Sequence, residues 1–228
     1  MMTASSVEAK VVSSKEIAMV VQVAPVARTG PTEIREKEIQ VNRIVILAAP
    51  SGAGKTTIMA RLIDAMSDKL SFSISATTRP MRTGEVDGKD YFFVSLADFQ
   101  QKIEQDGFVE WEMVYEGTYY GTTKDEMKRI WEMGKTPLLD IDVFGAMKVK
   151  RIYGTQVLSI FIEPPSIEVL RERLIKRGTD ATASIDKRIG KAAQEIEQKI
   201  HFDHIVLNDE LDRATDEVKA LVSRFLEA

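Results

Sequence analysis

Apolar and polar residues alternate along most of the chain with two different periods. Short apolar runs of strand length occupy residues 43–49, 136–142, 157–164 and 204–209. Each run precedes a longer segment whose apolar residues recur at helical spacing, over residues 56–66, 144–153, 166–177 and 211–228. Strands that are apolar throughout and separated by helices are typical of a parallel sheet covered on both faces. The pattern therefore predicts an α/β fold.

The segment from Ser71 to Thr123 has a different residue composition. Aromatic and β-branched residues gather there in "YFFVS", "FVEWEMVYE" and "TYYGTT", as they do in strands. One helical segment, "LADFQQKIEQ", follows Ser95, whose side chain suits a helix N-cap. We expect an inserted, mostly antiparallel lobe at 71–123 within a core of 42–70 and 124–228.

The first forty or so residues keep neither period. Their longest apolar run, "IAMVVQVAPVA", is interrupted by Gln22 and Pro25 and follows acidic residues, which does not suit a secretory signal or a membrane span. We expect residues 1–41 to be a flexible N-terminal extension. An organellar presequence is the weaker alternative, because the segment has several glutamates and few arginines.

The overall charge limits the partners. The chain has 31 basic and 35 acidic residues, and its net charge is −4. This balance supplies no general attraction for nucleic acid or an anionic membrane, so a bound phosphate must be met by a local basic cluster. We therefore expect no nucleic acid or membrane partner. Cytoplasmic residence is the default, and no motif distinguishes a monomer from a homodimer.

The chain has no cysteine, which excludes disulfides, thiolate metal sites and cysteine nucleophiles. Its only histidines, His201 and His204, could be proposed as a metal pair. They have no nearby carboxylate in the sequence other than Asp203, so we interpret them as solvated or structural residues. If a metal takes part, we expect a hard, oxygen-ligated ion that arrives with a phosphate substrate.

A glycine-bearing stretch, "APSGAGKTT", joins the first predicted strand to the first predicted helix. In this setting it is typical of the phosphate-binding loop Gly-x-x-x-x-Gly-Lys-Ser/Thr. Gly52 and Gly54 permit the unusual backbone angles of the loop. Lys55 can reach the β and γ phosphates, and the Thr56 hydroxyl can bind Mg²⁺. Ala49 stands where the pattern has its first glycine, and an alanine fits there if its φ is negative.

A second motif, "SISATTRPMRTGEVDGKDYFF", carries Arg79 and Arg82 three residues apart, followed by Glu85 and Tyr91. Two arginines and a tyrosine can clamp a phosphate monoester, because arginine offers bidentate geometry and tyrosine a neutral donor. Alone, the arginine pair would more often be a solvated basic turn. Beside a phosphate-binding loop, we interpret it as a second phosphate site.

With both motifs in place, the chain from about Arg43 onward resembles the guanylate kinases. The resemblance is carried by "APSGAGKTT", "SISATTRPMRTGEVDGKDY", "FVEWEMVYEGTYYGT", "LLDIDVFG", "RLIKRGT", Lys187–Arg188 and "VLNDEL". It implies a P-loop NTPase-type parallel sheet flanked by helices, with a small GMP-binding lobe and a helical lid. It also implies an enzyme of purine metabolism that transfers the γ-phosphate of ATP to GMP with Mg²⁺, giving ADP and GDP.

The resemblance places a monophosphate site largely in the lobe. The implied GMP-binding residues are Ser75, Arg79, Arg82, Tyr91, Glu110, Tyr120, Gly121, Thr122 and Asp142. The arginines and tyrosines would hold the GMP phosphate. Glu110 would select the base, because a carboxylate accepts from guanine N1–H and the exocyclic amine, whereas adenine has no N1–H. Ser75 and Thr122 would donate toward O6 or N7.

The resemblance also implies an ATP site and a catalytic set. The implied ATP-binding residues are Pro50, Ser51, Gly52, Ala53, Gly54, Lys55, Thr56, Thr57, Asn208 and Asp209, the last two against the adenine. The implied catalytic residues are Lys55, Arg82, Arg177 and Arg188, with Thr56 as the metal ligand. Arg177 is expected to end one helix and Arg188 to begin the next, which makes about 178–187 a mobile lid.

Three nearby positions stay open. Arg173 could assist the lid arginines or form an exposed ion pair. Asp140 and Asp142 end a predicted strand two residues apart, where carboxylates could orient a metal-bound water or a substrate. We place Asp142 at the guanine side, and Asp140 is open between a metal-bound water and a structural contact.

At three positions the sequence departs from the family pattern, so we consider two alternative functions. The departures are Ala49, the displaced proline in "RPMR", and Phe144 where many members carry a polar residue. One alternative is a guanylate-kinase-like module that binds peptides, although the retained Lys55 and Thr56 disfavour it. The other is a kinase of a different phosphate monoester or sugar phosphate, which Ser75, Glu110 and the tyrosines disfavour. dGMP would fit the same base contacts as GMP.

Overall fold

The computed structural model describes residues 42–177 and 182–228. The expected N-terminal extension and residues 178–181 of the expected lid lie outside the described residues. None of the described helices is both long and apolar enough to cross a membrane.

The main sheet is entirely parallel. Its strands are β1 (Ile44–Ala48), β2 (Leu70–Phe72), β7 (Thr136–Asp140), β8 (Val157–Glu163) and β9 (His204–Leu207), in the order β2-β7-β1-β8-β9. β1 lies at the centre, and all five of its residues are buried. A central strand covered on both faces explains why its sequence is apolar throughout. The predicted parallel α/β core is confirmed.

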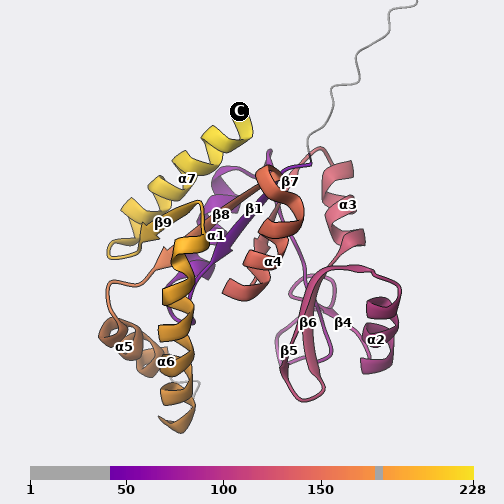
Figure 1. Cartoon of the computed structure of the whole chain (residues 1–228), viewed down its shortest axis with the longest axis horizontal. Coiled ribbons are helices and arrows are strands. Elements are labelled where there is room, and N and C mark those ends of the chain that lie inside the picture. The colour runs from indigo at the N-terminus through magenta and orange to yellow at the C-terminus, as the bar shows by residue number, and fades with distance from the viewer. Residues whose placement is uncertain (1–41, 178–181) are drawn as a thin grey trace, which may run out of the picture. The chain divides into compact units, whose positions relative to one another are not determined.

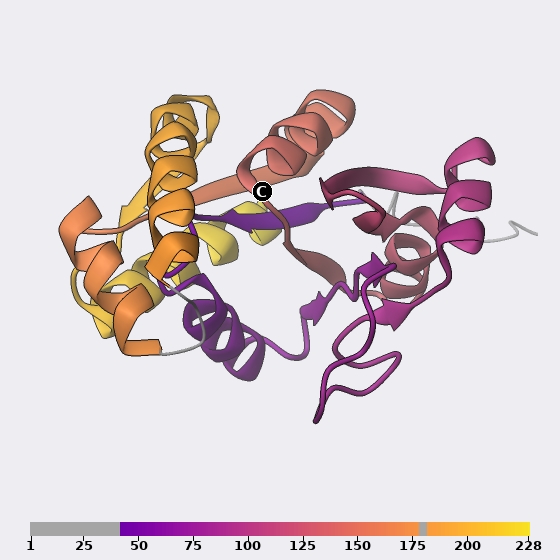
Figure 2. The same ribbon diagram turned by 90° about the horizontal axis from the view of Figure 1, so that it is seen from below.

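Helices cover both faces of this sheet (Figures 1 and 2). α1 (Lys55–Ala65) and α7 (Leu211–Glu227) pack on one face, against a core that includes Val45 and Leu47. α3 (Lys124–Glu132) and α4 (Val143–Tyr153) pack on the other face, against Ile44 and Ile46. The alternation follows from the period of two along β1.

Two further helices lie between β8 and β9 in the chain. α5 (Ile167–Arg177) and α6 (Thr182–Glu197) pack against each other, and the short 3₁₀ turns η1 (Gly154–Gln156) and η2 (Gln198–His201) precede β8 and β9. In Figure 1, α5 and α6 extend below β8 and β9.

The lobe has its own sheet. β3 (Ala76–Thr77), β4 (Phe92–Phe93), β5 (Phe108–Tyr115) and β6 (Thr118–Thr123) have the order β4-β3-β6-β5, and two of the three pairings are antiparallel. α2 (Leu96–Glu104) covers it, with Ser95 as the expected N-cap. Phe99 of α2 stacks on Phe108 with ring centroids 4.3 Å apart, which gives the lobe a small core of its own.

Three elements differ from the sequence-based expectation. β2 pairs with β7, so the main sheet continues to Phe72, beyond the expected start of the lobe. α3 was not expected as a helix. α6 begins at Thr182, so Arg188 lies inside this helix and does not begin it. The expected mobile segment before Arg188 is therefore helical over residues 182–187.

Candidate active site

A cleft of about 980 Å³ opens at the carboxyl end of β1 and β7 and extends to the lobe. Open parallel sheets bind ligands at this edge. Many of the predicted site residues line it: Pro50, Ser51, Gly52, Ala53, Gly54, Lys55, Thr56, Thr57, Ser75, Arg82, Tyr91, Glu110, Tyr120, Gly121, Asp142 and Arg188. Residues far apart in the sequence thus meet at one site.

The phosphate-binding loop has the backbone that its glycines predict. Gly52 and Gly54 have φ angles of 90° and 93°, in the left-handed region. Gly54 is the N-cap of α1, so the first N–H groups of that helix face the cleft, where they can bind anions. Asp106 is the one non-glycine residue with a positive φ in the described part of the chain, so Ala49 is not strained.

Two side chains hold the backbone of this loop, and one of them, Arg173, also lines the cleft. Asn208 is buried, and its Nδ2 donates to the carbonyl oxygen of Ala53 at 2.6 Å. Arg173 donates to the carbonyl oxygen of Asn208 at 3.2 Å and to that of Ala53 at 3.5 Å. Neither of the two roles considered for Arg173 describes this contact, because its guanidinium is partly buried and bonds to backbone oxygens. Arg173 and Asn208 therefore hold the loop that binds the phosphates.

Lys55 is held by the end of β7. Its Nζ forms an ion pair with Asp140 and donates to the carbonyl oxygen of Ile141 at 3.1 Å. Both side chains are accessible from the cleft, so a phosphate can compete with Asp140 for the ammonium group. In this structure, Asp140 therefore makes a direct contact with Lys55.

On the lobe, Arg79 is enclosed by other side chains. Its Nη1 and Nη2 donate to the two carboxylate oxygens of Glu85 at 2.7 and 2.8 Å, and its Nε donates to Tyr120 Oη at 3.2 Å. The guanidinium also lies over the rings of Tyr91 and Phe93, 5.2 and 5.5 Å from their centroids. The hydrogen bonds between Arg79 and Glu85 raise the pKa of Arg79 and hold the pKa of Glu85 at about 2.

Glu85 also accepts a hydrogen bond of 2.7 Å from the backbone N–H of Arg82. The Arg79–Glu85 pair thus fixes the turn that carries Arg82, even with the proline displaced in "RPMR". Arg79 does not line the cleft, whereas Arg82 does. Tyr91 does too, and burial, followed by the charge of Asp140, raises its pKa, which keeps its hydroxyl a neutral donor.

Glu110 is a buried carboxylate with a fixed orientation. Its Oε1 accepts from the backbone N–H and the hydroxyl of Thr122, at 2.9 and 2.8 Å. Its Oε2 lies so close to Gly145 that a Cβ there would be 3.1 Å away. Burial raises the pKa of Glu110, although the hydrogen bonds from Thr122 oppose the shift. Oε2 is therefore the oxygen left for a donor in the cleft.

Asp142 caps α4, with its Oδ1 accepting from the backbone N–H of Gly145 at 2.8 Å. It thus lies just beyond the strand that it was expected to end. The carboxyl group of Glu112 lies within hydrogen-bonding reach of it. This contact, together with burial, raises the pKa of Glu112 to about 7. Burial alone would raise the pKa of Asp142, but hydrogen bonds from Glu112 and the backbone N–H groups of Gly145 and Phe144 outweigh it and lower that pKa.

α6 contributes charged groups on the opposite side of the cleft. Arg188 Nη1 donates to Ser51 Oγ at 3.1 Å, so this arginine already contacts the phosphate-binding loop. Glu195 is buried, with one carboxylate oxygen 3.6 Å from Lys191 Nζ, and burial raises its pKa. Arg177 ends α5 as expected, and its side chain lies outside the described residues.

The donors in the cleft suit a metal that arrives with a phosphate. No group of three His, Asp or Glu side chains in residues 42–177 and 182–228 could hold an ion unaided. The Thr56 hydroxyl lies in the cleft at the first turn of α1, beside Lys55. Mg²⁺ is usually held by one or two protein oxygens together with substrate phosphates and water, and this donor set fits that mode.

Some predicted contacts differ from the expectation. The Thr122 hydroxyl donates to Glu110 and not toward the cleft, because the register of β5 and β6 sets these two residues opposite each other. Asn208 bonds to Ala53, and Asp209 pairs with Arg213 at 2.6 Å, so neither lines the cleft. The sequence did not single out six further residues that line it: Glu112, Val114, Ile141, Lys176, Lys191 and Glu195.

Comparisons with known proteins agree on one family. A family model described as guanylate kinase matches residues 41–225. A guanylate kinase from Porphyromonas gingivalis is 43% identical over 186 residues, covering 82% of this chain and 99% of the relative. One from Chlorobium chlorochromatii is 45% identical over 184 residues, covering 81% and 96%. The crystal structure of a guanylate kinase from Anaplasma phagocytophilum is similar with a TM-score of 0.64 at 29% identity, covering 80% of this chain and 85% of that one.

Proposed function

The chain belongs to the guanylate kinase family, and on this premise we propose which of its residues transfer the γ-phosphate of ATP to GMP. The activity predicted from the sequence, an ATP:GMP phosphotransferase that forms ADP and GDP, follows from this membership. The residue assignments are our own and rest on the cleft described above. We also propose that the chain is located in the cytoplasm and binds both nucleotides there.

The GMP phosphate binds between Arg82, Tyr91 and Tyr120 in this proposal. All three side chains line the cleft, and they combine one cation with two hydroxyl donors. Arg79 positions this group, because its guanidinium bonds to Tyr120 and, through Glu85, to the backbone of Arg82.

The guanine base is selected by Glu110. Its Oε1 already accepts two hydrogen bonds from Thr122, so Oε2 is free to accept from guanine N1–H and the exocyclic amine. Adenine presents a lone pair at N1 and would leave this buried carboxylate without a donor, which is costly. Ser75 lines the same cleft and can donate toward O6. dGMP makes the same base contacts, so we propose that it is also a substrate.

ATP binds with its phosphates on the loop of residues 50–57. The N–H groups at the start of α1 and the ammonium group of Lys55 face the place of the β and γ phosphates. Lys55 then exchanges its contact with Asp140 for a phosphate oxygen. Thr56 would hold Mg²⁺ together with the ATP phosphates, and the bound ion would supply positive charge beside the transferred group.

The reaction needs no covalent nucleophile from the protein. A GMP phosphate oxygen attacks the γ-phosphorus in line with the leaving ADP, and negative charge spreads over the moving group. Lys55, Arg82 and Arg188 line the cleft from three different elements and can surround that group with positive charge. We assign the same role to Arg177, which ends α5 close to the start of α6.

The observation that carries the proposal is that the phosphate-binding loop and Glu110 line one cleft. The test is a coupled assay of ADP formation from Mg·ATP with GMP, AMP, CMP or UMP, using the wild-type chain and Glu110→Gln. We expect turnover with GMP only, and a loss of kcat/KM for GMP of roughly tenfold to a hundredfold in the variant. If the folded chain binds ATP but phosphorylates none of the four, the domain acts as a binding module and the proposal is wrong.

A further inference from the structure

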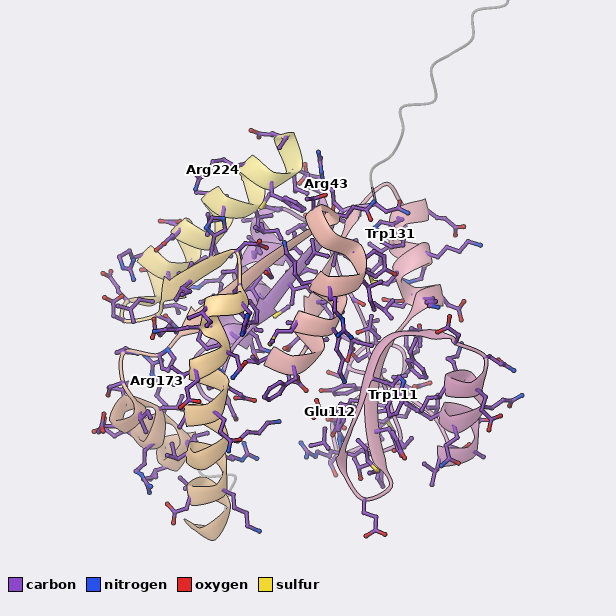
Figure 3. The ribbon with its side chains drawn as sticks, viewed as in Figure 1. Arg43, Trp111, Glu112, Trp131, Arg173 and Arg224 are labelled. Atoms are coloured by element: carbon purple, nitrogen blue, oxygen red, sulfur yellow. The ribbon has the colours of Figure 1, made fainter. Side chains whose placement is uncertain are left out.

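Glu112 is a carboxylic acid in the cleft that the proposed reaction does not use. It lies two residues after Glu110 on β5, so both side chains project from the same face of the strand. Both line the cleft, together with Asp142. In Figure 3, Glu112 lies on the side of β5 that faces α4, whereas Trp111 lies on the side that carries α2.

The environment of Glu112 favours its protonated form. Its Oε2 is buried and receives no hydrogen bond from the described residues. The carboxyl group of Asp142 is within hydrogen-bonding reach, and two ionised carboxylates cannot donate to each other. Asp142 is the better anion of the two, because backbone N–H groups at the start of α4 donate to it. Below a pH of about 7, Glu112 therefore carries the shared proton and donates a hydrogen bond through it to Asp142.

A neutral carboxyl group that donates through one oxygen still offers the other as an acceptor. A ligand with a spare hydrogen-bond donor at this point of the cleft would bond to this acceptor oxygen. Because Glu112 is neutral, it also adds no third negative charge beside Glu110 and Asp142. The group can therefore recognise a neutral N–H without repelling an anionic nucleotide. The backbone of β5 fixes its separation from Glu110.

Guanine has such a donor. Its exocyclic amine carries two hydrogens, and Glu110 can accept only the one on the N1 side. Two acceptors that each lie about 2.9 Å from one amine nitrogen, along directions about 120° apart, are about 5 Å from each other. Residues two apart on a strand are separated by about 6.6 Å at the backbone, so their side-chain oxygens can reach this spacing.

We propose that Glu112 is a second specificity-determining residue of the GMP site, whose neutral carboxyl group donates to Asp142 and accepts a hydrogen bond from the exocyclic amine of guanine. This inference rests on the proposed function, because it concerns the same base pocket. Glu112 would then contact the exocyclic amine, which is the group that guanine has and hypoxanthine lacks.

The test compares GMP with IMP, which lacks the exocyclic amine but keeps N1–H and O6. We would measure kcat/KM for both nucleotides in the wild-type chain, Glu112→Ala and Glu112→Gln, with the exposed Glu116→Ala as a matched control. Glu112→Ala should reduce the preference for GMP over IMP about fivefold, because one neutral hydrogen bond is lost. The loss should appear in KM for GMP, with kcat kept within about twofold.

Glu112→Gln supplies the decisive comparison, because its amide donates to Asp142 and accepts from the amine as the neutral acid does. It should keep the wild-type preference, as should Glu116→Ala. If Glu112→Ala lowers kcat/KM for GMP and IMP by the same factor, Glu112 only supports Asp142 and the inference is wrong. Absence of GMP turnover in the wild-type chain would instead contradict the proposed function, so the two failures are distinguishable.

Discussion

Arg79 and Glu85 meet through two parallel hydrogen bonds, 2.7 Å from Nη1 to Oε2 and 2.8 Å from Nη2 to Oε1. These bonds occupy hydrogen-bond donors of the arginine. The glutamate also accepts a hydrogen bond from the backbone N–H of Arg82. One ion pair thus sets the positions of both Tyr120 and Arg82, which face the GMP phosphate in our proposal.

The first prediction concerns Glu85. Glu85→Gln keeps the size of the side chain but removes the charge that orients Arg79. We expect KM for GMP to rise roughly tenfold while KM for ATP stays unchanged, because hydrogen bonds to charged groups are among the stronger ones. Steady-state kinetics with each substrate varied in turn measure the effect. Equal changes in both KM values would contradict a role confined to the monophosphate site.

The second prediction concerns Arg188, which already reaches Ser51. Arg188→Ala should lower kcat on the order of 10³-fold, because an arginine that stabilises the transferred phosphoryl group is worth about that much. Lys187→Ala is the matched control, since it removes a neighbouring exposed cation that does not line the cleft. Both are assayed at saturating ATP and GMP. Comparable losses in the two variants would mean that only the overall charge of α6 matters.

The third prediction concerns Gly54. Gly54→Ala adds a Cβ that collides with Asn208 Nδ2 and must adopt a φ of +93°. Gly134 has φ +71° with nothing within 4 Å of an added Cβ, so Gly134→Ala imposes the backbone strain alone. Gly134→Ala should lose about 1–2 kcal/mol in the free energy of unfolding from this strain, and Gly54→Ala should lose more because of the added collision. Only Gly54→Ala should also lose ATP affinity, by at least about tenfold, as measured by calorimetric titration.

The strand, loop and helix of the phosphate site could be predicted because their signals are local. Gly52, Gly54 and Lys55 lie within four residues, and the backbone angles follow from the residue types. The direction of the Thr122 hydroxyl could not be predicted in the same way, because it depends on the register of β5 with β6. Asn208 follows a strand at the far end of the chain, and its contact with Ala53 requires the assembled sheet.

The helix α3 and the cleft residue Glu112 were not predicted, although the sequence contains a signal for each. Thr123 followed three residues later by Glu126 is a capping-box pattern, and Thr123 does cap α3. Glu112 stands two residues after Glu110, so the period of a strand places it on the same face. β2 has only three residues, too few to show a period of its own.

The fourth prediction concerns pH. The folded-state pKa of Glu112, about 7, lies above its ordinary value of 4.5. The folded state therefore binds this proton more tightly than the unfolded state, and the resulting stabilisation is lost as the pH rises through about 7. The charged groups that face Glu112 are Asp142 at the N-cap of α4, Lys148 on α4, Lys191 on α6 and Glu110 on β5.

Glu112→Gln has no proton to lose at this position. Its free energy of unfolding, measured with urea, should therefore rise relative to that of the wild-type chain between pH 5 and pH 8. The lowered pKa of Asp142 acts below this range and leaves the comparison intact. A difference between the two chains that stays constant from pH 5 to pH 8 would show that Glu112 is ionised throughout.

The most direct test of the account follows the transferred group. The chain is mixed with Mg²⁺, GMP and ATP labelled at the γ-phosphate, and the nucleotides are separated after partial conversion. Our account predicts that the label appears in GDP, with one unlabelled ADP formed for each labelled GDP. Release of the label as inorganic phosphate, or ADP formation without labelled GDP, would contradict direct transfer from ATP to GMP in this cleft.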